Sequence, residues 1–175
     1  MKKWFLIQIL IIFHLITVSQ TIVDTTKLWN NFITYYNLWY YGTETIKFTS
    51  DTVIEGLNYK KVIRSLEEYP TNWSFYGYIR EDTSKRVFYR INGNEPDKII
   101  YDFNIDLYDT VNVYGLQNYE DNWFLNMDYY VYAIDSMMIG DSYRKRYYMA
   151  GVEAGVNEWI EGVGGTLGIL RNWNG

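Results

Sequence analysis

The sequence predicts an all-β protein whose antiparallel strands follow one another as a meander and close into a barrel or fold into a sandwich. β-Branched and aromatic residues alternate with polar ones through most of the chain, as they do in half-buried strands. Gly, Asn or Asp interrupts this alternation roughly every eight to twelve residues, the spacing of turns in all-β folds. The two prolines, Pro70 and Pro96, lie in polar connections, so neither blocks a central strand.

Residues 1–19 have the features of a signal peptide. Lys2 and Lys3 precede an apolar run over residues 4–16, and small or polar residues follow it. This run is shorter than the roughly 18 apolar residues that a membrane-spanning helix needs. We expect cleavage near Ser19 and Gln20, which leaves residues 20–175 as a single all-β domain without stable membrane insertion.

Loss of this segment reduces the kinds of catalytic and metal sites that the rest of the chain can form. The only histidine, His14, leaves with it, and the chain has no cysteine. Ser/His and Cys/His triads therefore cannot be assembled, nor can zinc or copper sites built on imidazole or thiolate. Lys2 and Lys3 leave as well, so 14 basic residues face 21 acidic ones and the net charge becomes −7. This charge repels phosphate backbones, so we expect no nucleic-acid partner.

The strands can be placed in order from the alternation. Val87, Tyr89 and Ile91 share one face of a strand, and Phe88 and Arg90 share the other. Residues 28–39 are the one segment that could instead form a short N-terminal helix. Further strands are predicted at residues 40–49, 52–55, 57–64, 75–81, 99–105, 110–114, 129–135 and 143–149, with Trp159 and Ile160 in a last strand.

One internal similarity supports a fold made of hairpins. Residues 51–61 match residues 135–145 without a gap, and each copy reads as strand, glycine turn, then Tyr and basic residues. Gly56 and Gly140 would supply the positive φ that a tight hairpin turn requires. The match occurs once, which predicts two similarly built hairpins and no solenoid.

Four aromatic residues are the candidate ligand-binding residues. Trp73 and Phe75 lie near a turn that contains a proline, and Trp123 and Phe124 lie in a long acidic loop over residues 115–128. Such residues are hard to place in a strand core. Exposed aromatics beside Asn and Asp can stack on sugar rings or anchor a partner protein, whereas buried ones would hold the loops in place.

Other motifs in the chain indicate no cofactor or metal. Asp102, Asn104 and Asp106 have the spacing of the first calcium-loop ligands, but Leu107 stands where the loop needs Gly and Val113 where it needs Glu. The glycine-rich string over residues 162–168 lacks the helix and βαβ unit of a dinucleotide site, so we interpret it as a turn.

Paired carboxylates leave one acid/base chemistry open, because glycoside hydrolysis needs neither His nor Cys. Such a pair must lie roughly 5 to 10 Å apart in space, which no spacing in sequence can show. The available acids are Glu81, Asp82, Asp102, Asp135, Glu158 and Glu161.

Eight strings form a further set, namely residues 51–61, 77–82, 87–90, 101–103, 109–111, 134–136, 144–147 and 159–164. Together they are similar to secreted Bacteroidetes proteins in which a β-rich module precedes a type IX secretion (Por secretion) C-terminal sorting domain. The resemblance spans most of residues 40–168 and implies a secreted or surface module with no assigned activity and no catalytic residue. Unlike that pattern, this chain ends at Gly175 without a sorting domain, so the periplasm is an alternative destination to the cell surface or exterior.

The sequence therefore predicts an exported structural or binding module that contacts a glycan or a cell-surface protein. A carboxylate-dependent glycoside hydrolase is the alternative. A hydrolase should bring two acids together in a pocket, whereas a binding module should present an exposed aromatic platform without such a pair.

Overall fold

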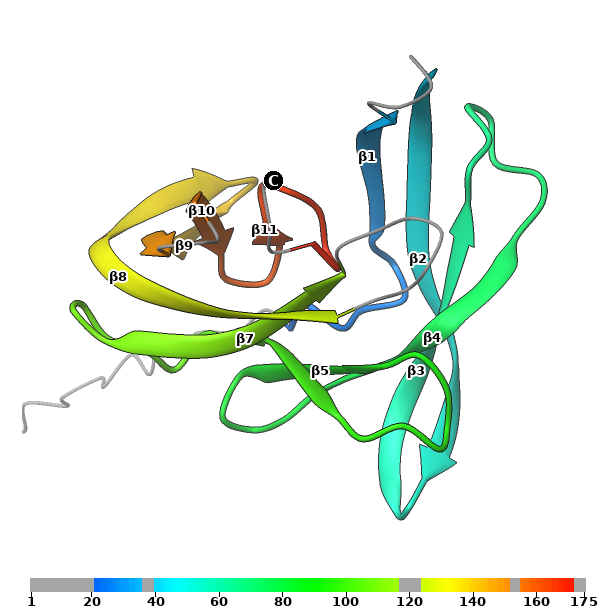
Figure 1. Ribbon diagram of the computed structural model, residues 1–175, viewed down its shortest axis with the longest axis horizontal. Helices are drawn as coiled ribbons and strands as arrows, with labels where there is room; N and C mark the ends of the chain where they lie inside the picture. Colours follow the sequence, from blue (N-terminus) through cyan, green and yellow to red (C-terminus); the bar gives the residue numbers. More distant parts are fainter. Residues whose placement is uncertain (1–20, 36–39, 117–123, 152–154, 172–175) are drawn as a thin grey trace, which may run out of the picture.

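A computed structural model describes residues 21–35, 40–116, 124–151 and 155–171, which form two curled antiparallel sheets (Figure 1). Sheet A has six strands in chain order: β1 (Leu28–Tyr35), β2 (Tyr40–Ile54), β3 (Leu57–Ser65), β4 (Ser74–Glu81), β5 (Arg86–Arg90) and β6 (Lys98–Asp102). Sheet B has five: β7 (Thr110–Leu116), β8 (Phe124–Ile139), β9 (Ser142–Gly151), β10 (Gly155–Ile160) and β11 (Gly164–Gly165). Consecutive strands within each sheet pair antiparallel, which confirms the predicted meander.

The N-terminal segment is a strand, so the helix considered for residues 28–39 is wrong over Leu28–Tyr35. β1 pairs with β2 along its whole length, from Leu28 opposite Lys47 to Tyr35 opposite Tyr40. Trp29 and Asn31 point inward on alternate positions, and Ile33 is 2% exposed. Pairing with a long neighbouring strand overrides a weak local preference for helix. The described residues contain no helix long and apolar enough to cross a membrane.

Some predicted strands are longer in the structure. Residues 40–49 and 52–55 form one strand, β2, with a register shift between Phe48 and Asp51. β8 extends from Phe124 to Ile139, well beyond the predicted 129–135, whereas β6 ends at Asp102. A bulge lets a strand bend and continue, so a break in alternation need not end it.

Both predicted glycine turns exist, but they differ in type. Between β2 and β3, Glu55 and Gly56 have φ values of 52° and 80°, the pattern of a type I′ turn. Between β8 and β9, Gly140 at 63° takes the first loop position and Asp141 the second, as in a type II′ turn. The sequence match therefore aligns the two glycines but not the two hairpins.

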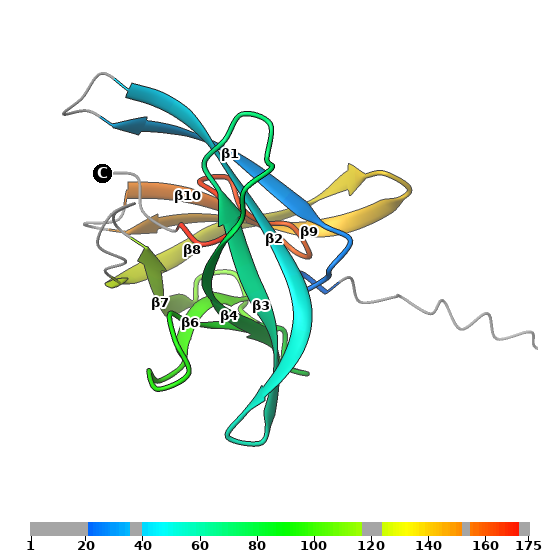
Figure 2. The ribbon, with the colours of Figure 1, turned by 90° about the vertical axis from the view of Figure 1, so that its right-hand side faces the viewer.

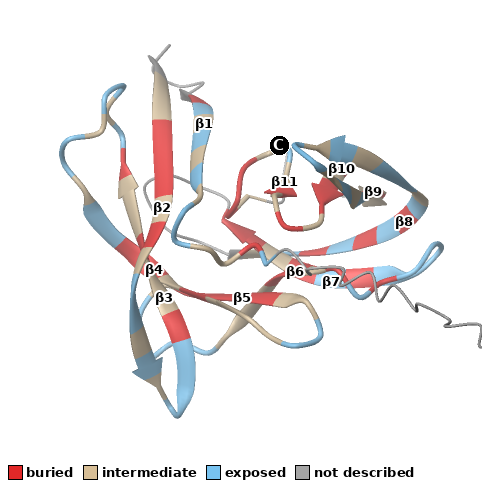
Figure 3. Cartoon of the chain, turned by 180° about the vertical axis from the view of Figure 1, so that it is seen from behind, coloured by how far each residue is buried: buried red, intermediate tan, exposed pale blue. Residues whose placement is uncertain are grey.

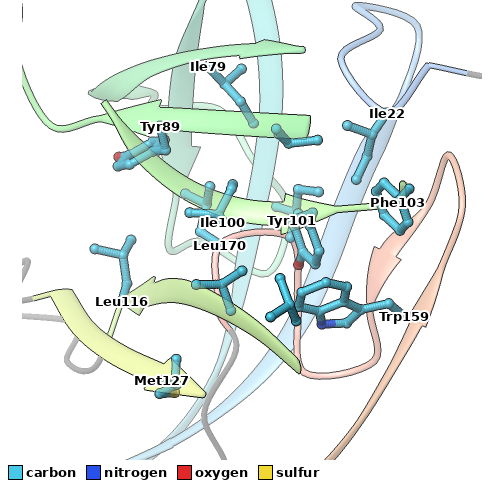
Figure 4. Packing of buried hydrophobic residues seen from close by; sticks show 14 of the residues in the cluster. Ile22, Ile79, Tyr89, Ile100, Tyr101, Phe103, Leu116, Met127, Trp159 and Leu170 are labelled. Atoms are coloured by element: carbon cyan, nitrogen blue, oxygen red, sulfur yellow. The ribbon is translucent and has the colours of Figure 1, made fainter. Parts of the chain in front are cut away.

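The core lies between the two sheets and is rich in aromatic rings (Figure 4). Trp159 is fully buried, with its ring centroid 5.0 Å from that of Tyr101 and 6.2 Å from that of Tyr129. Phe103 stacks on Tyr101 at 5.6 Å. Along β7 and β8 buried and exposed residues alternate, as Figure 3 shows, so each sheet has an inner and an outer face.

The glycine-rich string closes one side of this core as turns and the short strand β11, in agreement with the predicted turn. Trp29 Nε1 donates to the carbonyl of Val163 at 2.8 Å, and Tyr101 OH donates to that of Gly168 at 3.0 Å. A Cβ atom on Gly168 would lie 2.8 Å from the Asn31 side chain, so only glycine allows this close approach.

A buried charged cluster anchors the end of the closing segment. Glu44 of β2 is 1% exposed and lies 3.6 Å from Arg64 and 3.5 Å from Arg171. Asn31 donates a hydrogen bond to Glu44 Oε2, whereas Glu44 Oε1 accepts none from the residues that the structure describes. The guanidinium of Arg64 lies over the ring of Tyr76, 4.0 Å from its centroid. The cluster joins β1, β2 and β3 to the C-terminal segment.

Candidate functional site

The strongest candidate surface is a row of side chains on the outer face of sheet A, the face that Figure 2 looks onto. Leu28 lies opposite Lys47, Lys47 opposite Ile63, and Ile63 opposite Phe75, so the row crosses β1 to β4. The row faces outward because Lys47 alternates with the buried residues Ile46 and Phe48.

Both ends of this row are apolar and exposed. Leu28 is 52% exposed and Phe75 is 51% exposed. Large apolar side chains that are exposed close together on one face mark contact sites more often than scattered single ones do. We call the outward side chains of Leu28, Lys47, Ile63, Trp73, Phe75 and Tyr78 the Trp73 face.

Trp73 lies on this face just before β4 and is half-buried. The ammonium of Lys47 sits 3.9 Å from the centroid of the indole ring. A cation–π contact of this kind is worth about 0.5 to 1 kcal/mol at an exposed site and orients the ring. Trp73 is therefore held over β2 with one part of its ring available to solvent.

The loop before Trp73 is organised by one carboxylate. Glu67 accepts hydrogen bonds from the backbone and hydroxyl of Thr71 and from the backbone and amide of Asn72. These hydrogen bonds, led by those from Asn72, lower the pKa of Glu67 to about 2. The ionised carboxylate accepts hydrogen bonds from both residues 71 and 72 and so fixes the backbone of the loop there. Trp73 follows directly in the chain, so its position is fixed as well.

The aromatic surface continues along β4. The ring centroids of Phe75 and Tyr78 are 5.0 Å apart in an edge arrangement, and those of Tyr78 and Tyr59 are 6.5 Å apart. Tyr59 is only 1% exposed, since Arg80 and Asp97 cover it from the solvent side. The exposed part of the row therefore ends at Tyr78.

The group that covers Tyr59 is an ion-pair network. Asp97 accepts hydrogen bonds from Arg90 Nε at 2.6 Å, from Arg80 Nε at 3.0 Å and from Tyr59 OH at 2.8 Å. Burial by itself would raise the pKa of Asp97, but the hydrogen bonds from Arg90 and Arg80 outweigh it and lower the pKa. The carboxylate of Asp97 is therefore ionised and hydrogen-bonded to three side chains. The network stabilises the sheet, and Asp97 has no proton to donate as a general acid.

The four predicted ligand-binding residues fall into two groups. Trp73 and Phe75 lie together on the outer face of sheet A, as described above. Trp123 lies outside the described residues. Phe124 begins β8 opposite Leu116, and its side chain also lies outside what the structure describes. The prediction for these last two residues remains untested.

The candidate hydrolase acids occur mainly in ion pairs. Asp82 pairs with Arg86, Glu161 with Lys85, and both Asp135 and Glu158 with Arg146. Glu81 accepts a hydrogen bond from the backbone N–H of Ile22 at 2.7 Å, and Asp102 accepts one from that of Asn104 at 2.9 Å. Over the described ranges, no three His, Cys, Asp or Glu side chains are grouped so that they could hold a metal ion.

Sequence reasoning missed Leu28, Lys47 and Ile63. The alternation of the sequence could have predicted that such side chains point outward, since Lys47 stands between the apolar residues Ile46 and Phe48. The sequence could not predict that these three side chains lie side by side, because this depends on the register of β1 against β2 and of β2 against β3. Comparison of the chain with protein-family models, curated proteins and solved structures finds no match.

Proposed function

We propose that this protein is an exported binding module and that the Trp73 face docks on a protein at the cell surface. The proposal combines the signal-like segment 1–19 with a cross-strand row whose two ends, Leu28 and Phe75, are apolar and exposed. A sheet face held by neighbouring strands presents its side chains with little entropy left to lose on binding.

One observation carries the proposal. Leu28 and Phe75 are each about half exposed at the two ends of a single cross-strand row, and Trp73 lies against the lysine between them. Aromatic side chains that are partly ordered before binding are typical anchors of protein interfaces. The aliphatic side chains of Leu28 and Ile63 favour a protein over a glycan, since they add apolar area but no ring for a sugar to stack on.

A carboxylate-based hydrolase receives less support from the geometry. A general acid must stay protonated near neutral pH, which requires a raised pKa. Hydrogen bonds from Arg146 instead lower the pKa of Asp135. Hydrogen bonds from Arg86 outweigh partial burial and lower the pKa of Asp82. Both groups are ionised partners of an arginine, as expected of structural ion pairs.

The test is binding of the labelled mature chain, residues 20–175, to whole cells of the organism that produces it. Trp73→Ala and Phe75→Ala should each weaken binding at least about tenfold, which corresponds to roughly 1.4 kcal/mol. Tyr143→Ala is the matched control, because Tyr143 is an exposed aromatic outside the Trp73 face. All three variants should keep the melting temperature of the parent chain to within about 2 °C, since none removes a core residue.

Pretreatment of the cells identifies the partner class. Protease digestion should abolish the binding that depends on Trp73, whereas periodate oxidation of surface glycans should leave it intact. The reverse result would assign a glycan to this face. Full binding by folded Trp73→Ala and Phe75→Ala proteins would refute the Trp73 face as a contact surface.

A further inference from the structure

The outer face of sheet B carries a second aromatic surface, on the opposite side of the core from the Trp73 face. Tyr130 and Tyr132 of β8 are each 43% exposed, while Tyr129 and Val131 between and beside them are fully buried. Tyrosines at alternate positions of a strand stand on one face, about 6.6 Å apart along it. The register of β8 with β9 shifts between Val131 and Ala133, which brings Ala133 to this outer face, and Tyr148 of β9 lies opposite it and joins the tyrosines there.

The tyrosines form two ring pairs. The centroids of Tyr108 and Tyr130 are 6.2 Å apart and the rings are inclined by only 21°. The centroids of Tyr132 and Tyr148 are also 6.2 Å apart, with an inclination of 40°. The two pairs follow one another along β8, so the surface is an elongated strip and not a single pocket.

Tyr108 is held in this strip by an unusual backbone. Its φ is 74°, a conformation that costs a bulky residue of the L series on the order of 1 kcal/mol or more. Its N–H donates to the carbonyl of Val131 at 2.9 Å, and the N–H of Val131 donates to the carbonyl of Asp109 at 2.9 Å. The ring is 66% exposed, so core packing does not account for the strain. Strained backbone that displays an exposed side chain is typical of functional positions.

Polar groups beside each ring pair are fixed by their own hydrogen bonds. Asn112 donates to Asp128 at 2.6 Å, next to Tyr130 on the same face. Asp135 accepts two hydrogen bonds from Arg146, at 2.8 and 2.6 Å, and one from Tyr148 OH at 3.3 Å. Each ring pair thus has donors and acceptors close by in set positions, which lowers the entropy lost when a ligand binds.

The charge of the strip restricts the ligand. Of the charged side chains just described beside the ring pairs, Asp128 and Asp135 are acidic and Arg146 is basic, and Glu158, which also pairs with Arg146, adds a third carboxylate, so these four groups sum to −2. This charge repels sulfated or uronic-acid polymers. The attraction for a cation is also reduced, because Arg146 already pairs with Asp135 and lies 3.7 Å from Glu158.

We propose that this tyrosine strip binds an uncharged glycan, independently of the function proposed for the Trp73 face. The electron-rich face of a tyrosine ring attracts the C–H bonds on the flat side of a sugar. Sugar hydroxyls both donate and accept hydrogen bonds, which suits a surface where an amide and a guanidinium stand beside carboxylates. An elongated strip fits a chain of sugars better than a single one.

The test uses uncharged polysaccharides as probes, namely laminarin, mannan, galactan, arabinoxylan and soluble starch, in affinity gel electrophoresis. Alginate and heparin serve as anionic counterparts, and poly-lysine as a cationic peptide. At least one uncharged polymer should retard the mature chain, whereas alginate and heparin should not. Tyr130→Ala and Tyr132→Ala should each reduce the affinity at least about tenfold.

Matched variants separate this inference from the proposed function. Phe75→Ala should retain full polysaccharide binding, because Phe75 lies on sheet A, and Tyr130→Phe should retain most of it, because the ring remains. A thermal melt of each variant shows that it is folded. The inference fails if no uncharged polymer binds, if poly-lysine or an anionic polymer binds more tightly, or if folded Tyr130→Ala and Tyr132→Ala bind as the parent does.

Discussion

Replacing Glu44 by glutamine should destabilise the protein far more than an equivalent change in a shorter ion pair at the surface. Glu44 is 1% exposed and lies between the guanidinium groups of Arg64 and Arg171, whose side chains are 16% and 11% exposed. Glu44→Gln keeps the shape of the side chain but leaves two nearly buried cations without the negative charge between them. Removal of one partner from a buried ion pair costs about 3 to 5 kcal/mol.

The magnitude can be worked from the distances. At an effective dielectric constant of about 20, unit charges separated as these are attract by roughly 4 to 5 kcal/mol for each pair, before desolvation is counted. The arginines retain some contact with water, so we expect the lower end of the range, about 3 kcal/mol of unfolding free energy. Arg171 lies in the segment that closes the core, and its release should also lower the cooperativity of unfolding.

The assay is urea unfolding at pH 7, with Asp51→Asn as the control. Asp51 approaches Lys60 at 2.6 Å, closer than either contact of Glu44, but its side chain is 71% exposed. An exposed pair contributes about 0 to 1 kcal/mol, so this control should unfold close to the parent. The double variant Glu44→Gln/Arg171→Gln should lose less than the sum of its two single variants. Equal losses for Glu44→Gln and Asp51→Asn would refute the reasoning, because distance and not burial would then govern stability.

Three further predictions concern a glycine within β4, the turn between β2 and β3, and the loop before Trp73. Gly77→Ala should cost about 3 kcal/mol or more in a denaturant titration, since the new Cβ would lie 2.4 Å from a backbone oxygen, whereas Gly93→Ala, with nothing within 4 Å, should be nearly neutral. Gly56→Val should lower thermal stability by about 1 to 2 kcal/mol because valine disfavours the φ of 80°, and an unchanged melt would remove the turn assignment. The folded-state pKa of Glu67 is about 2, below its ordinary value of 4.5, so its support of the loop is complete above 4.5 and is lost as the pH falls toward 2. The NMR signal of the Trp73 indole in the folded protein should therefore shift with a midpoint near pH 2 in the parent but not in Glu67→Gln, and identical titrations would contradict this role.

The two hairpins show how far sequence similarity extends and where it stops. The sequence match pairs Tyr59 with Tyr143, yet Tyr59 is 1% exposed and Tyr143 is 73% exposed. Tyr59 is buried because Arg80 and Asp97 bond to its hydroxyl on the outer face of sheet A, whereas Tyr143 lies beside the turn at the end of its hairpin. The glycines were correctly interpreted as turns, because positive φ is a local property. The exposure of the two tyrosines depended on which side chains of other strands pack against them.

The candidate surfaces also combine features that the local sequence predicts with features that depend on strand pairing. Trp73 and Phe75 were singled out because they fit poorly into a strand core, and the structure places both on one outer face. The tyrosine strip was not predicted, since Tyr132 and Tyr148 are separated in sequence and meet only through the register of β8 with β9. The backbone conformation of Tyr108 has no local signal, because its N–H bonds to Val131 across the sheet.

Alternation of side chains and the turn glycines were sufficient to predict the all-β class and the meander. Each of these depends on residues that are neighbours in sequence. Only the tertiary structure decided that residues 28–35 form a strand, that Glu44 and Arg171 share one buried cluster, and which aromatic rings share an outer face. These are outcomes of long-range pairing, where the gain from burial and hydrogen bonding across the sheets exceeds any preference of the local segment.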